Sequence, residues 1–154
     1  MTTTLTRIRT LFLHPQLTYA IGEAASLLEM DGRELRARMD SGEVEGVKTG
    51  EGVVLPWAEL VSFAMERWSQ EVVEDALGAE LAAVLPEMVR LTALEVRIPR
   101  MEVVALERLA ALGGETVSAV LARELRDVVS AHSEWLSREV PGFAEALVWP
   151  EVLS

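Results

Sequence analysis

The stretch "IGEAASLLEMDGRELRARMDSGEVEGVKTGEGVVLP", residues 21–56, decides the fold of the N-terminal part of the chain. Its first nine residues place small and apolar side chains at helical spacing, and the "MDG" that follows interrupts the helix. Asp31 and Glu34 have the spacing of a capping box, which predicts the start of a second helix, and Gly42 predicts its end. The stretch therefore predicts two short helices joined by a tight turn.

The second helix is expected to have one buried and one exposed side. At about 100° per residue, its apolar residues share the side that faces the core. Arg33 and Arg36 then point outward, and Arg38 lies on a flank. Glu34 and Asp40 border the same outer surface, so its charge is mixed.

A hairpin and a third helix complete this part. The segment "VEGVKTGEGVVLP", residues 44–56, holds two β-prone runs around a glycine-containing turn, which predicts a small hairpin. Pro56 suits the first turn of a helix, and "WAELVSFAMERW", residues 57–68, has an apolar stripe at helical spacing.

This order of elements resembles the excisionase-like, winged members of the helix-turn-helix class, which are related to mercury-resistance-type regulators. The resemblance covers residues 17–68. It implies that the second helix enters the major groove of DNA and that the hairpin lies along the backbone as a wing. It also implies that Arg33 and Arg36 lie at the groove, with Lys48 and Thr49 on the wing. Alternatively, the unit uses this shape for packing alone.

The charge of the chain is distributed unevenly. The formal net charge is -11 at pH 7, whereas proteins that bind DNA usually present a basic surface. Residues 1–50 hold six basic and seven acidic side chains, and residues 51–154 hold eight basic and eighteen acidic ones. Most of the acidity therefore lies outside the candidate DNA reader.

A different periodicity begins near residue 91. In "ALEVRIP", residues 93–99, apolar side chains alternate with others, which predicts a strand with one apolar face. Two helical patterns joined at "GGETVS", residues 113–118, come next. This strand-helix-helix order resembles the ribbon-helix-helix family. The resemblance implies that the strand pairs with its twin in a second chain and that the paired ribbon enters the major groove.

The resemblance thus implies a homodimer. Its interface residues would be Leu94, Val96, Ile98, Val117 and Leu121. The outward side chains of the ribbon are Ala93, Glu95 and Arg97, of which only Arg97 suits a DNA contact, so dimerisation is favoured over base reading. The strand could instead pair with the hairpin of its own chain, which would make a dimer unnecessary.

These patterns divide the chain into five parts. They are an N-terminal arm (1–16), a winged helix-turn-helix domain (17–68), a helical connector (69–90), a ribbon-helix-helix-like dimerisation unit (91–136) and an apolar acidic tail (137–154). The tail carries Phe143, Leu147, Val148 and Trp149, a large apolar area for a terminus. It either docks on a partner protein, which would be basic, or folds back over the core of its own chain.

The composition limits the chemistry that the chain can perform. The chain has no cysteine, which excludes disulfides, thiolate catalysis and cysteine-based metal sites. Its two histidines, His14 and His132, have no partners at a recognised catalytic or metal-binding spacing. We therefore expect neither an enzyme nor a metal or cofactor site. No apolar run approaches the roughly 18 residues of a membrane span and no signal peptide is evident, so we expect a cytoplasmic protein without a membrane partner.

The sequence predicts a mainly helical protein with a small β component that acts as a dimeric, sequence-specific transcriptional regulator on a palindromic operator. Two weak readers held at fixed spacing gain affinity through avidity. A DNA-binding module, a dimer module and an apolar acidic tail are together typical of the antitoxin of a toxin–antitoxin pair. Such a protein would repress its own operon and neutralise a basic toxin such as a ribonuclease. The alternative is a protein–protein adaptor or scaffold that retains the helix-turn-helix fold without binding DNA.

Overall fold

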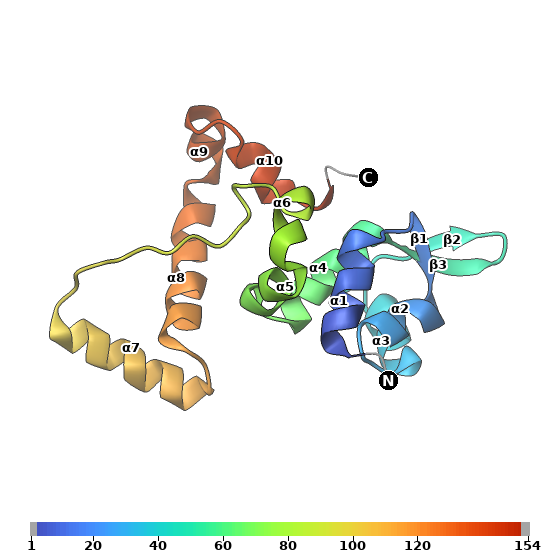
Figure 1. The fold of residues 1–154 in the computed structure, drawn as a ribbon, viewed down its shortest axis with the longest axis horizontal. Helices are drawn as coiled ribbons and strands as arrows, with labels where there is room; N and C mark the ends of the chain where they lie inside the picture. The colour runs from blue at the N-terminus through green and yellow to red at the C-terminus, as the bar shows by residue number, and fades with distance from the viewer. Residues whose placement is uncertain (1–2, 152–154) are drawn as a thin grey trace. The chain divides into compact units, whose positions relative to one another are not determined.

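The computed structural model describes residues 3–151, and it is mainly helical with a small three-stranded antiparallel sheet (Figure 1). The chain forms two compact units. The first unit consists of residues 1–91 together with 145–154, and the second consists of residues 92–144. Within the described part of the chain, no helix has both the length and the apolar composition needed to cross a membrane.

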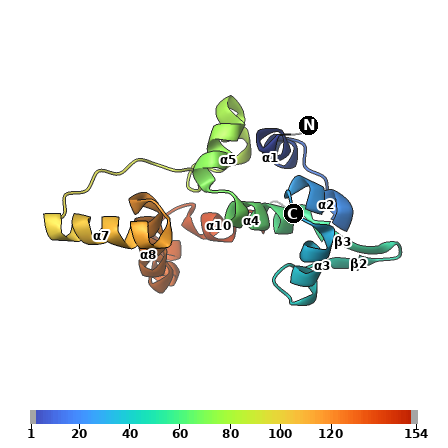
Figure 2. The ribbon, with the colours of Figure 1, turned by 90° about the horizontal axis from the view of Figure 1, so that it is seen from below.

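The first unit contains most of the secondary structure. Its elements are α1 (Thr4–Leu13), β1 (Thr18–Ala20), α2 (Ile21–Leu27), α3 (Gly32–Asp40), β2 (Val47–Thr49), β3 (Gly52–Pro56), α4 (Trp57–Arg67), α5 (Gln70–Leu77), the 3-10 turn η1 (Gly78–Glu80) and α6 (Leu81–Val84). The two short helices, the hairpin and the helix after Pro56 that the sequence predicts are all present. Figure 2 shows the β2–β3 hairpin extending beside α3.

Local signals set the bounds of α2 and α3. Glu29 adopts a left-handed conformation with φ 53°, which ends the turn after α2. The carboxylate of Asp31 accepts a hydrogen bond from the backbone N–H of Arg33 at 2.7 Å and caps α3. Glu34 does not complete the predicted capping box, because its side chain pairs with Arg38 instead. Gly42, with φ 83°, ends α3.

The sheet has the order β1-β3-β2, so β3 is its central strand. Tyr19 of β1 lies opposite Leu55, and Lys48 of β2 lies opposite Val53. The sequence did not predict β1, because three residues are too few to show an alternating pattern. Residues 92–99 do not join this sheet, so the alternative in which they pair with the hairpin is wrong.

An N-terminal helix, not an arm, occupies the start of the chain. Ile8, Leu11 and Phe12 of α1 are buried in the core of the first unit. Thr3 caps this helix by accepting a hydrogen bond from the backbone N–H of Thr6 at 3.3 Å. The expectation of an arm at residues 1–16 is thereby corrected.

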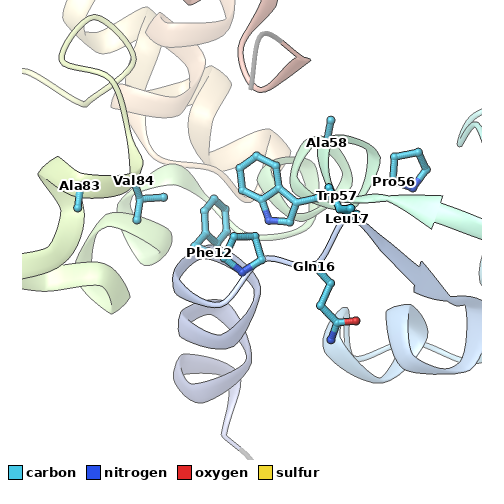
Figure 3. Close-up of a pocket in the computed structure, with 9 residues that line it drawn as sticks. Phe12, Gln16, Leu17, Pro56, Trp57, Ala58, Ala83 and Val84 are labelled. Atoms are coloured by element: carbon cyan, nitrogen blue, oxygen red, sulfur yellow. The ribbon is translucent and has the colours of Figure 1, made fainter. Parts of the chain in front are cut away.

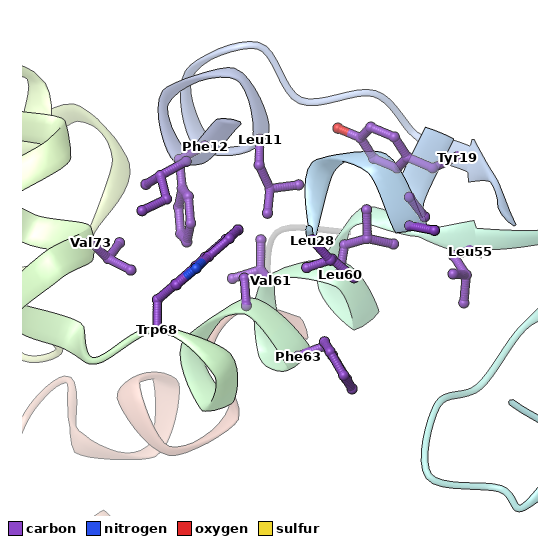
Figure 4. Packing of buried hydrophobic residues seen from close by; sticks show 14 of the residues in the cluster. Leu11, Phe12, Tyr19, Leu28, Leu55, Leu60, Val61, Phe63, Trp68 and Val73 are labelled. Carbon is purple, nitrogen blue, oxygen red and sulfur yellow. The ribbon is translucent and has the colours of Figure 1, made fainter. Parts of the chain in front are cut away.

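The core of the first unit joins α1 to the helices that come after the sheet. Figure 4 shows Leu11 and Phe12 of α1 pointing towards Val61 and Trp68. The predicted connector contributes to the same core, because α5 and the turn after α6 bury apolar side chains. These are Val73, Ala76, Leu77 and Leu85. Residues 69–85 are therefore part of the first unit's core and do more than connect it to the second unit.

The C-terminal tail belongs in part to the first unit. Trp149 packs against the core cluster of that unit, and Pro150 is buried. Leu147 and Val148 are about half exposed (48% and 47%), and Phe143 is partly buried. The tail was expected either to dock on a partner protein or to fold back over the core of its own chain. The position of Trp149 agrees with the second alternative.

The second unit has little core of its own. It contains α7 (Arg100–Gly113), α8 (Val117–Ala131), α9 (Ser133–Glu139) and the start of α10 (Phe143–Val148). Gly114, with φ 65°, ends α7, and the hydroxyl of Thr116 caps α8. Only Ala110 and Val120 are buried among the described apolar residues of this unit. Residues 92–99 are exposed and unpaired, so the predicted strand does not form within a single chain.

Tyr19 is expected to make the stability of the first unit sensitive to alkaline pH. The side chain is 1% exposed, and its hydroxyl accepts a hydrogen bond from the backbone N–H of Gln16 at 2.8 Å. Burial raises the pKa of the phenol above its ordinary value of 10.0, and the bond from Gln16 lowers it by less. The folded chain therefore keeps the proton at pH values where the unfolded chain has lost it. The contribution of Tyr19 to the free energy of unfolding should be constant below about pH 10 and fall as the pH rises further.

Because Tyr19 is the only tyrosine of the chain, the absorbance of tyrosinate reports on this group alone. Its titration midpoint should lie above that of the urea-unfolded protein. Tyr19→Phe should remove the alkaline loss of stability that this group causes, while costing about 1 kcal/mol at neutral pH because Gln16 loses its acceptor. Equal midpoints in the folded and the unfolded protein would contradict the account.

Candidate nucleic-acid interface

A hollow of about 250 Å³ lies between α3 and the β2–β3 hairpin. The residues that line it are Ile21, Arg36, Met39, Asp40, Gly46, Lys48 and Val53. Arg36 and Lys48, two of the DNA contacts expected from the sequence, thus lie at one site although they belong to different elements. We refer to this hollow as the α3–hairpin groove.

Two features of the sequence hold α3 against the hairpin. Leu35 is fully buried and therefore turns the opposite side of α3 towards solvent. Gly46 lies close to two side chains, since an added Cβ would come within 2.5 Å of Met39 Cε and of Val53 Cγ1 and both would have to move. Gly46 was not predicted from the sequence, although a glycine directly before a β-prone run was a signal that could have been used.

The groove and helix α3 present cations that are free to bind an anion. The side chains of Arg33, Arg36 and Lys48 are exposed, and they form no hydrogen bond or ion pair with any other residue that the structure describes. Guanidinium and ammonium groups bind phosphate oxygens, and guanidinium also pairs with the acceptor atoms of guanine in the major groove. Asp40 lies in the same groove and partly offsets this positive charge.

Arg38 is committed to contacts within the protein. Its guanidinium pairs with Glu34 at 3.3 Å and with Glu43 at 3.1 Å, and it lies 5.1 Å from the centre of the Phe63 ring. Exposed ion pairs of this kind contribute little each, but together with the ring contact they hold the side chain in place. Arg38 therefore joins α3 to Glu43 and Phe63, and its expected contact with DNA stays a prediction.

Thr49 is not among the residues that line the groove, and Arg97 belongs to the other unit. The hydroxyl of Thr49 donates a hydrogen bond to the backbone oxygen of Gly52 at 2.8 Å, so it closes the turn of the hairpin. Arg97 belongs to the second unit, where it is exposed among the unpaired residues 92–99. Of the six DNA contacts expected from the sequence, two therefore line the groove, namely Arg36 and Lys48, and Arg33 is exposed on the same helix as Arg36.

The expected dimer residues are exposed to different extents in the single chain. Leu94, Val96 and Ile98 are 79%, 53% and 36% exposed. Val117 and Leu121 are half-buried, on the helix that packs against α7. The single chain therefore does not gather these five side chains into one core.

A search for metal-binding side chains among the described residues and comparisons with known proteins give no further indication of function. Among residues 3–151, no group of three or more histidine, cysteine, aspartate or glutamate side chains is arranged to hold a metal ion. Comparison of the chain with family models, with curated proteins and with solved structures finds no match. Function is therefore inferred from the geometry of the groove and of the two units.

Gly46→Ala should disturb the groove. The new methyl group would press on Met39 and Val53, so the free energy of unfolding should fall by about 1 kcal/mol, the lower end of the cost of overpacking, because both contacts are side-chain ends that can move. Gly50→Ala is a matched control, because nothing lies within 4 Å of a Cβ added there. Chemical denaturation followed by circular dichroism measures both changes. A Gly46→Ala protein as stable as the Gly50→Ala protein would show that α3 does not contact the hairpin this closely.

Proposed function

We propose that the first unit is a winged helix-turn-helix module that binds DNA. In this proposal α2 and α3 are the two helices of the motif, α3 enters the major groove, and the β2–β3 hairpin is the wing. The observation that carries the proposal is that two exposed cations without a partner among the described residues, Arg36 of α3 and Lys48 of the hairpin, line one groove. Arg33 is exposed on the same helix.

The dimensions of α3 agree with this role. A helix of 9 residues is about 14 Å long at 1.5 Å per residue. The major groove is about 12 Å wide, so it admits the diameter of one helix, which is about 10–12 Å with its side chains. Leu35 anchors the inner side of α3, so Arg33 and Arg36 reach outward towards base edges or phosphates. Lys48 would contact the backbone beside the groove.

The groove is a weak reader taken alone. Asp40 lies beside Arg36 and Lys48, and a carboxylate near phosphate costs binding energy. We therefore infer that the functional form holds two copies of the reader at a fixed distance, which raises affinity through avidity. The target would be a palindromic site.

The second unit supplies the dimer contact in this proposal. Residues 92–99 are exposed and make no strand pairing within the chain, yet their apolar side chains alternate. An isolated strand is not stable, because its backbone groups and its apolar face need a partner. Pairing of Leu94, Val96 and Ile98 with the same residues of a second copy would meet both needs.

The protein would act as a transcriptional regulator. A narrower proposal is that it is the antitoxin of a toxin–antitoxin pair, with the exposed Leu147 and Val148 contributing to the contact with a basic toxin. The competing proposal is an adaptor that uses the helix-turn-helix shape for packing. Asp40 and the net charge favour the adaptor, whereas the unpaired Arg33 and Arg36 favour a DNA reader.

Arg33→Ala and Arg36→Ala, combined in one protein, separate the reader from the adaptor. A reader should lose affinity for DNA, and the slope of log K against log salt should become shallower by about 0.9 for each phosphate contact removed. Fluorescence anisotropy with a labelled duplex, at several salt concentrations, measures both quantities. Both side chains are exposed, so the fold should not change.

Arg126→Ala is the control for this experiment, because Arg126 is exposed on α8 and belongs to the second unit. It should leave both the affinity and the salt slope unchanged. Equal DNA binding by the wild type and the doubly substituted protein would favour the adaptor.

Val96→Lys should prevent the dimer. A charge placed in the paired apolar face is unfavourable, so the protein should sediment as a monomer and lose helical circular dichroism from the second unit. Glu95→Lys introduces the same side chain one residue earlier, on the opposite side of the extended segment, and should leave the dimer intact. Analytical ultracentrifugation distinguishes the two, and equal masses for both variants would contradict a ribbon that pairs through Val96.

A further inference from the structure

A second and larger pocket lies in the first unit, away from the α3–hairpin groove. Its volume is about 410 Å³, and Figure 3 shows its lining. The lining residues come from the end of α1, the segment before β1, the start of α4, and α6. They are Phe12, Pro15, Gln16, Leu17, Pro56, Trp57, Ala58, Ala83 and Val84. Nothing in the proposed DNA reader uses this pocket.

The walls of the pocket are apolar and aromatic. Figure 3 shows Phe12 and Val84 on one side of the Trp57 ring and Pro56 and Ala58 on the other. The indole N–H of Trp57 donates a hydrogen bond to the backbone oxygen of Leu11 at 2.8 Å, which orients the ring. Trp57 therefore offers a ring surface to an occupant, because its polar atom is already bonded.

Gln16 is the single polar side chain among the lining residues. Its amide N–H₂ donates to the carboxylate of Glu23 at 2.8 Å, which directs the amide group. No donor among the described residues is bonded to its carbonyl oxygen, so this oxygen is free to accept a hydrogen bond from an occupant. No charged side chain lines the pocket, which disfavours an ionic ligand.

We infer that this pocket binds an uncharged, flat aromatic molecule that carries one hydrogen-bond donor. The volume falls within the range of about 300–1,000 Å³ that is usual for small-molecule sites. The aromatic side chains Phe12 and Trp57 suit a ring system of similar size, and the Gln16 carbonyl suits the donor. Leu17, which is 92% exposed, would be covered in part by the ligand.

Strand β3 connects this pocket to the candidate DNA interface, because it contributes a residue to each. Strand β3 ends at Pro56, which lines this pocket, and its second residue Val53 lines the α3–hairpin groove. The two residues are about 10 Å apart along an extended strand. The backbone N–H of Trp57 also donates to Leu17 at 3.3 Å and so joins α4 to the segment before β1. A ligand that shifts Pro56 and Trp57 would therefore shift the hairpin and change DNA binding, a consequence that rests on the proposed function.

Binding is tested on the full chain with indole as the probe. The chain has four tryptophans, and their side-chain N–H resonances can be followed in ¹H–¹⁵N spectra and assigned with Trp→Phe variants. The resonance of Trp57 should shift saturably, whereas that of the exposed Trp135 in the second unit should not. 1-Methylindole lacks the donor and should bind roughly two- to tenfold more weakly.

Ala83→Leu and Ala82→Leu form a matched pair of variants. Both alanines are exposed on α6, but only Ala83 lines the pocket. Ala83→Leu should fill part of the pocket and weaken indole binding by about tenfold or more, while Ala82→Leu should bind as the wild type does. The inference is overturned if Trp57 shows no saturable shift, if Ala83→Leu binds indole normally, or if the Trp57 resonance responds to protein concentration and not to indole, which would assign the pocket to a second copy.

A DNA titration with and without saturating indole tests the consequence separately. The affinity for DNA should change in the wild type and not in Ala83→Leu. If the protein binds indole at Trp57 but binds no DNA, the pocket stands and the proposed DNA function fails. If the protein binds DNA but not indole, the proposed DNA function stands and the inference about the pocket fails.

Discussion

Burial of apolar side chains in one core is the interaction on which the first unit depends. Leu35 of α3 and Leu55 of β3 are both fully buried in the same cluster, although they lie in different elements. Because Leu35 faces the core, Arg33 and Arg36 face solvent. Because Leu55 faces the core, the hairpin runs beside α3 and brings Lys48 to the same groove as Arg36. The positions of the candidate DNA contacts thus result from the burial of apolar residues that make no contact with a ligand.

The second unit, in contrast, buries few of its apolar side chains within a single chain. With only Ala110 and Val120 buried among its described apolar residues, it falls short of the burial that small domains need to offset their conformational entropy. Residues 92–99 of this unit also form no strand, so their backbone groups lack the hydrogen bonds of a sheet. A second copy of the same segment is the occupant that the alternation of its side chains favours. Dimerisation and the folding of this unit would then be one process, and the spacing of two readers would depend on it.

Much of the first unit could be predicted from the sequence, because its signals are local. Asp31 and Gly42 mark the ends of α3, and the glycine-containing turn marks the hairpin. Helix α1 was not predicted, since its threonines and arginines obscure an apolar side that only the tertiary core makes evident. Strand β1 was missed because three residues are too few to show an alternation, and only its pairing with β3 identifies it as a strand.

The candidate site was predicted less completely than the fold. Spacing along the helix correctly directed Arg33 and Arg36 outward, but it could not show that Glu43, beyond the end of the helix, pairs with Arg38. It also could not show that Gly46 allows the hairpin to approach α3, or that Phe12, Trp57 and Ala83, far apart in sequence, form one pocket. These features depend on tertiary contacts, which periodicity within a single element does not report.

The proposed binding of DNA by the first unit can be tested directly. The most direct test is the affinity of the purified protein for the DNA upstream of its own gene, compared with a scrambled duplex of the same composition, at about 50 and 200 mM salt. The account predicts tighter binding to the upstream DNA and a steep loss of affinity at the higher salt concentration, because phosphate contacts release counterions. Equal and weak binding to both duplexes at the lower salt concentration would contradict it.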